Sequence, residues 1–184
     1  AHHGRNAVLA PDVPPMSGES GARTVQIGDL ADHLDLVPVV AAWHWREWRT
    51  DEPDSAEAKF LAILAARTHR DEVPFTLLAL LGNEPVGSLS VCWDDADAEF
   101  ADEGPWLSGL FVVGAARDLG TGRKLLGAAE ARTLAHGHPE LWAHTGEAER
   151  FYVRCGWEVV RPKEPLVRDA VVRVAPRAVR PPRH

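Results

Sequence analysis

The residues whose types and spacing most clearly suggest a binding site lie around two glycines, Gly120 and Gly122. An apolar run over 110–113 precedes them, and a run with helical periodicity over 123–134 follows them. A glycine-rich turn between a strand and a helix lets the backbone approach a ligand closely and points the first helical amides at it. The helix dipole contributes about half a positive charge there, and three basic side chains add to it: Arg117, Arg123 and Lys124. The segment therefore predicts a site for a pyrophosphate.

Two familiar nucleotide motifs do not fit this turn. The Walker pattern needs Gly-x-x-x-x-Gly-Lys-Ser/Thr, but Arg123 follows the second glycine. The dinucleotide fingerprint needs a third glycine where Leu125 stands. An ordinary helix start rich in small residues is the alternative interpretation without a ligand.

The turn does resemble the acyl-CoA turn of the Gcn5-related N-acetyltransferase (GNAT) superfamily, whose pattern is Arg/Gln-x-x-Gly-x-Gly/Ala. As in that family, Val112 ends a strand five residues before Arg117. A second segment, 139–160, resembles the family's next strand and short helix, although Thr145 stands where the family often has asparagine. The residues that carry this second match are Ala148, Phe151, Tyr152, Gly156 and Trp157.

The hydrophobic pattern predicts one domain over residues 22–176, which is also the range of the resemblance. Residues 1–21 are expected to be an arm or an added tail, and 177–184 a C-terminal tail. The resemblance implies the α/β (α+β) GNAT fold, with a mixed central sheet of about six to seven strands flanked by about four helices and with strands four and five splayed. The pattern predicts strands at 24–27, 74–81, 85–93, 106–113, 141–144, 157–161 and 170–175, and helices from about 35 to 48, 55 to 70, 123 to 136 and 147 to 155.

The resemblance also implies a reaction, the direct attack of a neutral amine on the thioester of acetyl-CoA, the cosubstrate. This reaction needs a positioned thioester, a donor to the oxyanion, a base for the ammonium proton and an acid for the thiolate. The family supplies the first two with main chain of its fourth strand and the acid with a tyrosine, which here is Tyr152. Tyr152 could instead be an aromatic residue packed under the sheet with its hydroxyl satisfied. The implied cofactor-binding residues are Leu110, Phe111, Val112, Arg117, Asp118, Leu119, Gly120, Thr121, Gly122, Arg123 and Lys124.

No family motif marks the base or the acceptor site. His44 is expected to be a helix-surface histidine, and His144, at the end of a strand near the predicted splay, is the better histidine candidate for a base. An acidic loop is expected to be mainly solvated, although it could relay a proton or attract a cation; its carboxylates are Asp94, Asp95, Asp97, Glu99, Asp102 and Glu103. The tryptophans that could wall an acceptor pocket are Trp43, Trp45, Trp106 and Trp142.

Composition argues against several other classes. No apolar run approaches the roughly 18 residues of a membrane span, and a net charge of −7 does not suit a general nucleic-acid binder but would suit a cationic acceptor. Cys92 and Cys155 are expected to be reduced thiols of a cytoplasmic protein. The motifs His2-His3 and His136-x-His138 lack the partners of a metal site, so no metal is expected.

Taken together, the residues and the resemblance predict an N-acetyltransferase that uses acetyl-CoA and acts on a primary amine of a small molecule or peptide. An aminoglycoside or other antibiotic acetyltransferase is an alternative that the sequence does not separate. A non-catalytic acyl-CoA-binding sensor is a second alternative, against which the presence of Tyr152 argues. Whether the chain forms a homodimer is left open.

Overall fold

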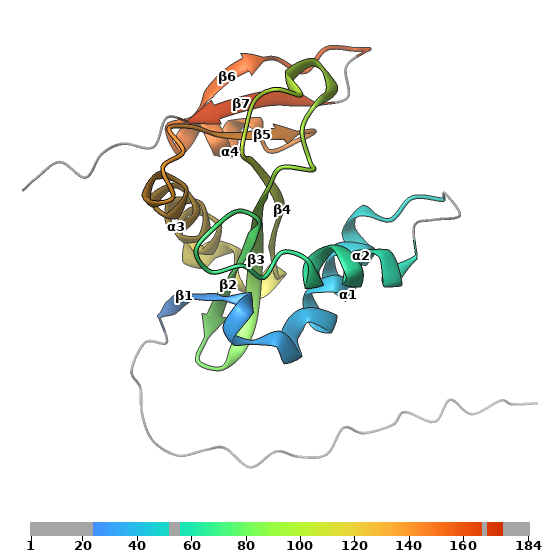
Figure 1. The fold of residues 1–184 in the computed structure, drawn as a ribbon, viewed down its shortest axis with the longest axis vertical. Helices are drawn as coiled ribbons and strands as arrows, with labels where there is room; N and C mark the ends of the chain where they lie inside the picture. The colour runs from blue at the N-terminus through green and yellow to red at the C-terminus, as the bar shows by residue number, and fades with distance from the viewer. Residues whose placement is uncertain (1–23, 52–55, 167–168, 175–184) are drawn as a thin grey trace, which may run out of the picture.

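A computed structural model describes residues 24–51, 56–166 and 169–174 (Figure 1). The predicted arm at 1–21 and the predicted tail at 177–184 lie outside the described residues. Within these ranges, no helix combines the length and the apolar character needed to cross a bilayer.

The centre of the molecule is a seven-stranded mixed sheet in the order β1-β2-β3-β4-β5-β7-β6. β4 and β5 are parallel, and the other neighbouring strands are antiparallel. The predicted strands are confirmed to within one or two residues at each end. Their bounds are β1 Val25–Asp29, β2 Phe75–Leu81, β3 Glu84–Cys92, β4 Trp106–Val112, β5 Leu141–Thr145, β6 Glu158–Arg161 and β7 Ala170–Val174.

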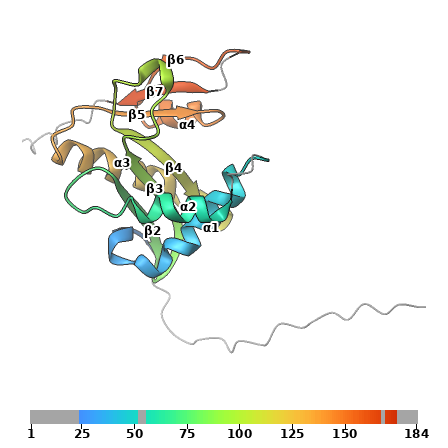
Figure 2. The same ribbon diagram turned by 45° about the vertical axis from the view of Figure 1, so that its right-hand side comes forward.

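Helices cover both faces of the sheet, and the alternation of side chains along β2 explains how. Leu77 packs into the main core with α3, whereas its neighbour Leu78 packs with α1 and α2 on the other face. Figures 1 and 2 show α3 on one side of β2–β4 and the α1–α2 pair on the other. The α-helices are α1 Val37–Trp48, α2 Glu57–Ala65, α3 Thr121–Ala135 and α4 Glu149–Arg154, and the 3₁₀ helices are η1 Leu30–Asp32, η2 Leu34–Leu36, η3 Ala98–Phe100 and η4 Gly114–Leu119.

The prediction that the second helix runs to about residue 70 is wrong, because α2 ends at Ala65. Beyond that point, the guanidinium of Arg132 on α3 binds the carbonyl groups of His69 and Arg70. The amide of His69 donates to the Pro74 carbonyl at 3.2 Å, whereas in a continuing helix it would donate to the carbonyl of residue 65. The early end also lets Arg67 turn inward, where only 7% of its surface is exposed.

The predicted splay between β4 and β5 is confirmed. The two strands pair at Trp106 and Trp142, near their amino ends, and the Trp142 amide donates to the Pro105 carbonyl at 3.0 Å. Among the described residues, no further pair of residues joins β4 and β5 beyond this point. The carboxyl halves of two parallel strands therefore part in the middle of the sheet, beside the glycine turn that follows β4.

Candidate active site

The glycine turn forms an open helix N-terminus. Gly120 is the N-cap of α3, with φ 70° and ψ 19°, a left-handed conformation that glycine adopts readily. The amide of Lys124 donates to the Gly120 carbonyl at 3.1 Å and so begins the hydrogen-bond ladder of the helix. Because a glycine cap carries no side-chain acceptor, the amides from Thr121 to Arg123 lack both an intrahelical acceptor and a capping group. These amides and the helix dipole can bind an anion.

Several contacts hold the turn in this shape. The buried hydroxyl of Thr121 donates to the Ala116 carbonyl at 2.8 Å, and the Nε of Arg117 donates to the Val112 carbonyl at 3.1 Å. A Cβ on Gly122 would lie 3.4 Å from Cζ of Phe151, so the start of α3 lies directly against α4. The turn is thereby fixed relative to the end of β4.

The basic side chains of the turn differ in what they contact. The ammonium of Lys124 donates to the Val25 carbonyl at 3.2 Å, which directs it toward β1. Arg117 uses its Nε within the turn, and its side chain is exposed, as is that of Arg123. Of the predicted cofactor-binding cations, Arg117 and Arg123 therefore face solvent beside the open amides, and Lys124 is already engaged.

A β-bulge distorts β4 before the 3₁₀ helix η4 and the glycine turn. Ser88 faces Phe111 and Ser90 faces Ser108, so two residues of β4, 109 and 110, lie opposite one residue of β3. Gly109 takes the left-handed conformation, with φ +63°. A bulge bends its strand and redirects its backbone groups. It lies where β4 leaves β5.

The expectation that His44 lies on the helix surface is wrong. His44 is 5% exposed, and its Nε2 lies 2.9 Å from Oγ of Ser88. Its ring covers the bulge so closely that a Cβ on Gly109 would lie 2.6 Å from His44 Cε1. Burial, with a smaller effect of Arg67, lowers the pKa of His44 to about 4, so the ring is neutral at pH 7. The isolated glycine within an apolar strand is the sequence signal that could have revealed the bulge.

Tyr152 lies on α4 within the main core, with 4% of its surface exposed. Its ring centroid lies 5.0 Å from that of Trp157 and 5.5 Å from that of Phe151. Burial raises the pKa of the phenol above its usual value. The hydroxyl is therefore protonated throughout the physiological pH range, as the role of an acid requires.

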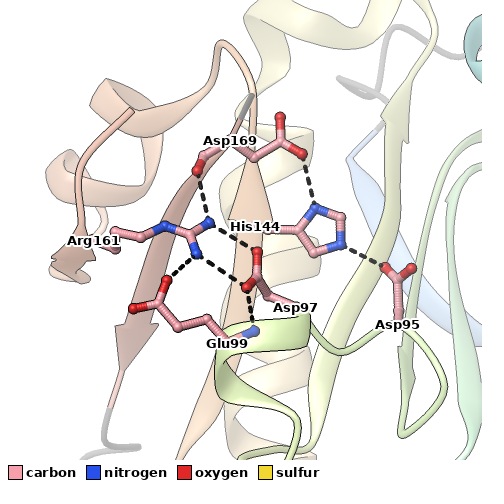
Figure 3. A network of polar contacts seen from close by, with 6 residues as sticks. All are labelled: Asp95, Asp97, Glu99, His144, Arg161 and Asp169. Atoms are coloured by element: carbon pink, nitrogen blue, oxygen red, sulfur yellow. Dashed lines mark hydrogen bonds and ion pairs between the residues drawn. The ribbon is translucent and has the colours of Figure 1, made fainter. Parts of the chain in front are cut away.

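The acidic loop is mainly solvated, as predicted, but two of its carboxylates, Asp95 and Asp97, are partly buried against basic side chains (Figure 3). The other four are exposed: Asp94, Glu99, Asp102 and Glu103. Arg161 on β6 binds Asp97 at 2.8 Å and Glu99 at 2.6 Å. Asp95 Oδ2 lies 3.4 Å from Nε2 of His144. Hydrogen bonding to Arg161 lowers the pKa of Asp97. The loop is thus tied to β5 and β6 by partners that lie far along the chain.

Arg67 is a buried cation that the sequence did not predict. It donates to Ser108 Oγ at 3.3 Å, one residue before the bulge, and to Asp94 at 3.2 Å. Burial would raise the pKa of Asp94, but the charge of Arg67 lowers it below its usual value. This ion pair borders an open cavity of about 470 Å³, lined by Ala62, Ile63, Ala66, Arg67, Pro74, Trp93 and Asp94.

Some of the tryptophans are buried in the core, and others lie at the surface. Trp106 and Trp142 were predicted as pocket walls, but they are 0% and 2% exposed and form a core cluster with Val171 under the acidic loop. Trp43 packs against Phe111 with the ring centroids 5.5 Å apart. Arg49 stacks on Trp45, whereas Trp48, 42% exposed, contacts both His44 and Phe111. Among the described residues, no group of three or more His, Cys, Asp or Glu is arranged to hold a metal ion.

Comparison with known families agrees with this architecture. Residues 37–157 match the model of the acetyltransferase (GNAT) family. Because the match covers more than half of the 184 residues, the chain belongs to this family. The predicted family and fold are therefore confirmed. A comparison with curated protein sequences finds no match.

Solved structures share the fold at low identity. An aminoglycoside 6'-N-acetyltransferase from Enterococcus faecium is 15% identical, with a TM-score of 0.62 over 85% of this chain and 99% of that one. An aminoglycoside 6'-N-acetyltransferase in complex with coenzyme A gives the same values. The PaiA N-acetyltransferase from Thermoplasma acidophilum, also in complex with coenzyme A, is 17% identical, with a TM-score of 0.60 over 83% and 99% of the two chains. At these identities the likeness concerns the fold.

Proposed function

We propose that this protein transfers the acetyl group of acetyl-CoA to a primary amine of a small molecule or peptide by direct attack. The observation that carries the proposal is the row of uncapped amides from Thr121 to Arg123, beside the point where β4 parts from β5. Membership of the acetyltransferase family supports it, as do fold relatives that hold coenzyme A.

In this proposal, the amides from Thr121 to Arg123 bind the pyrophosphate, and the exposed guanidinium groups of Arg117 and Arg123 add positive charge. Asp118, Leu119 and Gly120 shape the approach to the turn. The thioester lies along β4 from Leu110 to Val112, where an amide freed from pairing by the bulge can donate to the oxyanion.

Tyr152 then acts as the acid. The lone pair of the neutral amine forms a bond to the carbonyl carbon, the carbon–sulfur bond breaks, and the phenol gives its proton to the departing thiolate. The nitrogen of the new amide then loses its extra proton, which restores the phenol. A buried, protonated phenol on the α4 helix, next to the start of α3, suits this role. The same burial also fits a packing role, so the hydroxyl must be tested separately from the ring.

An aminoglycoside acceptor is supported only by fold likeness at 15% identity. Aminoglycosides are polycations and would favour an uncompensated acidic surface. Four carboxylates of the acidic loop already have cationic or histidine partners: Asp94, Asp95, Asp97 and Glu99. Because Asp97 and Glu99 share Arg161, and Asp102 and Glu103 are exposed, the loop keeps a net negative charge, which suits an acceptor with a cationic amine. We also infer a cytoplasmic location, supported by the free thiols of Cys92 and Cys155.

The proposal is tested by following thiol release from acetyl-CoA with a panel of monoamines, polyamines, peptides and aminoglycosides, with the mass of each product measured. Tyr152→Phe keeps the ring and should lower kcat by about 10²–10⁴-fold with little change in melting temperature. Phe151→Leu, a neighbouring substitution that leaves the phenol intact, is the control for packing. Calorimetric binding of coenzyme A without acetylation of any amine would instead support the sensor alternative.

A further inference from the structure

His144 lies at the gap between the splayed strands, on the face away from α3. Trp106 and Trp142 are paired across β4 and β5 and lie in one cluster on that face. Two residues further along each strand, Ser108 and His144 project to the same face, since side chains alternate with a period of two. The His144 ring lies 6.2 Å from that of Trp106, and a third of the side chain is exposed. His144 thus borders the gap opposite the residue that precedes the bulge.

Both ring nitrogens of His144 face carboxylates (Figure 3). Nδ1 lies 3.4 Å from Oδ2 of Asp169, and Nε2 lies 3.4 Å from Oδ2 of Asp95. Arg161 donates to the backbone carbonyl of Asp169 at 3.1 Å and forms an ion pair with Asp97. The charges of Asp97 and His144 also interact. Hydrogen bonding to Asp95, opposed by burial and reinforced by Asp169, raises the pKa of His144. This surrounding stabilises an imidazolium.

The other described titratable groups near the gap are less suited to accept a proton. His44 is buried, its Nε2 is engaged with Ser88, and its pKa of about 4 makes it a weak base. Asp94 is paired with Arg67, and Asp97 with Arg161. His144 combines partial exposure, a position at the gap and two carboxylates that stabilise its protonated form.

We propose that His144 takes the proton from the acceptor ammonium, that Asp169 orients the ring through Nδ1, and that Asp95 holds the ammonium beside Nε2. This inference rests on the proposed acetyl transfer and names its base. The lone pair of Nε2 accepts the proton as the N–H bond of the ammonium breaks. The freed amine attacks the acetyl carbon, the carbon–sulfur bond breaks, and the thiolate takes a proton from Tyr152. The nitrogen of the new amide loses its second proton, which restores the phenol of Tyr152. The imidazolium afterwards releases its proton to solvent.

The pH dependence of kcat/KM tests this assignment. A base must be neutral to act, so the wild-type rate should fall with decreasing pH through the His144 pKa, which lies above 6.5. Asp169→Asn removes a negative charge that stabilises the imidazolium, so the acidic limb should move to lower pH. His144→Gln should abolish that limb and lower kcat/KM by about 10²–10⁴-fold, with coenzyme A affinity unchanged.

His69→Gln is the matched control, because His69 is an exposed histidine in the loop after α2. It should leave both the rate and the pH profile unchanged. An unaltered acidic limb in both Asp169→Asn and His144→Gln, in an enzyme that acetylates amines, would overturn the role of His144 and leave acetyl transfer intact. A wild-type chain that binds coenzyme A but acetylates no amine would overturn both. Melting temperatures of the two variants show whether a lost rate reflects unfolding.

Discussion

Replacing Gly122 by proline should remove one amide donor from the start of α3 while leaving the helix intact. Gly122 is the second residue of α3, where the amide has no acceptor within the helix. The chain itself shows that proline fits this position, because Pro38 is the second residue of α1. Val37, the residue before it, keeps the helical angles φ −53° and ψ −45°. The substitution therefore removes a donor without removing a helical hydrogen bond.

The expected loss follows from the charge of the ligand. A hydrogen bond to a charged group contributes about 1.5–3 kcal/mol, so coenzyme A should bind about 10-fold to 150-fold more weakly. Gly122→Ala is the matched control, since it adds the same Cβ, 3.4 Å from Phe151 Cζ, but keeps the amide. Its affinity for coenzyme A should stay within a few-fold of wild type.

Isothermal titration calorimetry of both variants with coenzyme A provides the measurement, and thermal unfolding confirms that each is folded. The contrast between alanine and proline isolates the amide from the added volume. A folded proline variant that binds coenzyme A as tightly as the alanine variant would refute the assignment of the pyrophosphate to these amides. An equal loss of affinity for coenzyme A in both variants would instead point to crowding against Phe151.

Three further predictions concern the other face of the sheet. Gly109→Ala should destabilise the fold by about 2 kcal/mol or more, because φ is +63° and the Cβ would collide with His44. In denaturant unfolding, Gly109→Ala should lower the free energy of unfolding by less when His44→Ala is also present, since the ring it collides with is then absent. Because the folded pKa of His44, about 4, lies below the unfolded value of 6.5, the free energy of unfolding should fall by roughly 3 kcal/mol from pH 6.5 to 4, and His44→Gln should remove this component. The raised pKa of His144 should stabilise the fold below pH 6.5. The free energy of unfolding of wild type should therefore exceed that of Asp169→Asn at low pH, and this difference should disappear as the pH rises through the folded pKa of His144.

The parts of the fold that sequence reasoning predicted depend on local signals. Gly137 and Gly156 take left-handed angles, φ 85° and 91°, after α3 and α4, as expected of glycines that end helices. Gly82 and Asn83 form the turn between β2 and β3, as a Gly-Asn pair between two strand-like segments favours. At these positions the residue type itself restricts the backbone, so no knowledge of distant contacts is needed.

The features that were missed depend on residues far apart in the chain. His44 is buried because a bulge in β4, some 65 residues later, presents a glycine to its ring. Arg161 of β6 pairs with Asp97 and Glu99 of the acidic loop, and Arg67 is buried by its contacts with Ser108 and Asp94. Residue types along one segment do not reveal such pairings, because each depends on how the sheet brings strands together.

β4 separates two environments of opposite charge, and this separation bears on how the proposed reaction would proceed. Leu110 and Val112 pack toward the core that holds α3, whereas Phe111 packs toward Trp43 and Trp48 of α1. The anionic cosubstrate would therefore meet amides and guanidinium groups at the α3 end, and the cationic acceptor would meet Asp95 on the opposite face. Each substrate would be disfavoured at the site of the other by like charge. The gap left by the splayed strands would then be the place where the amine and the thioester meet, with the proposed base, His144, on one face and the phenol of Tyr152 on the other.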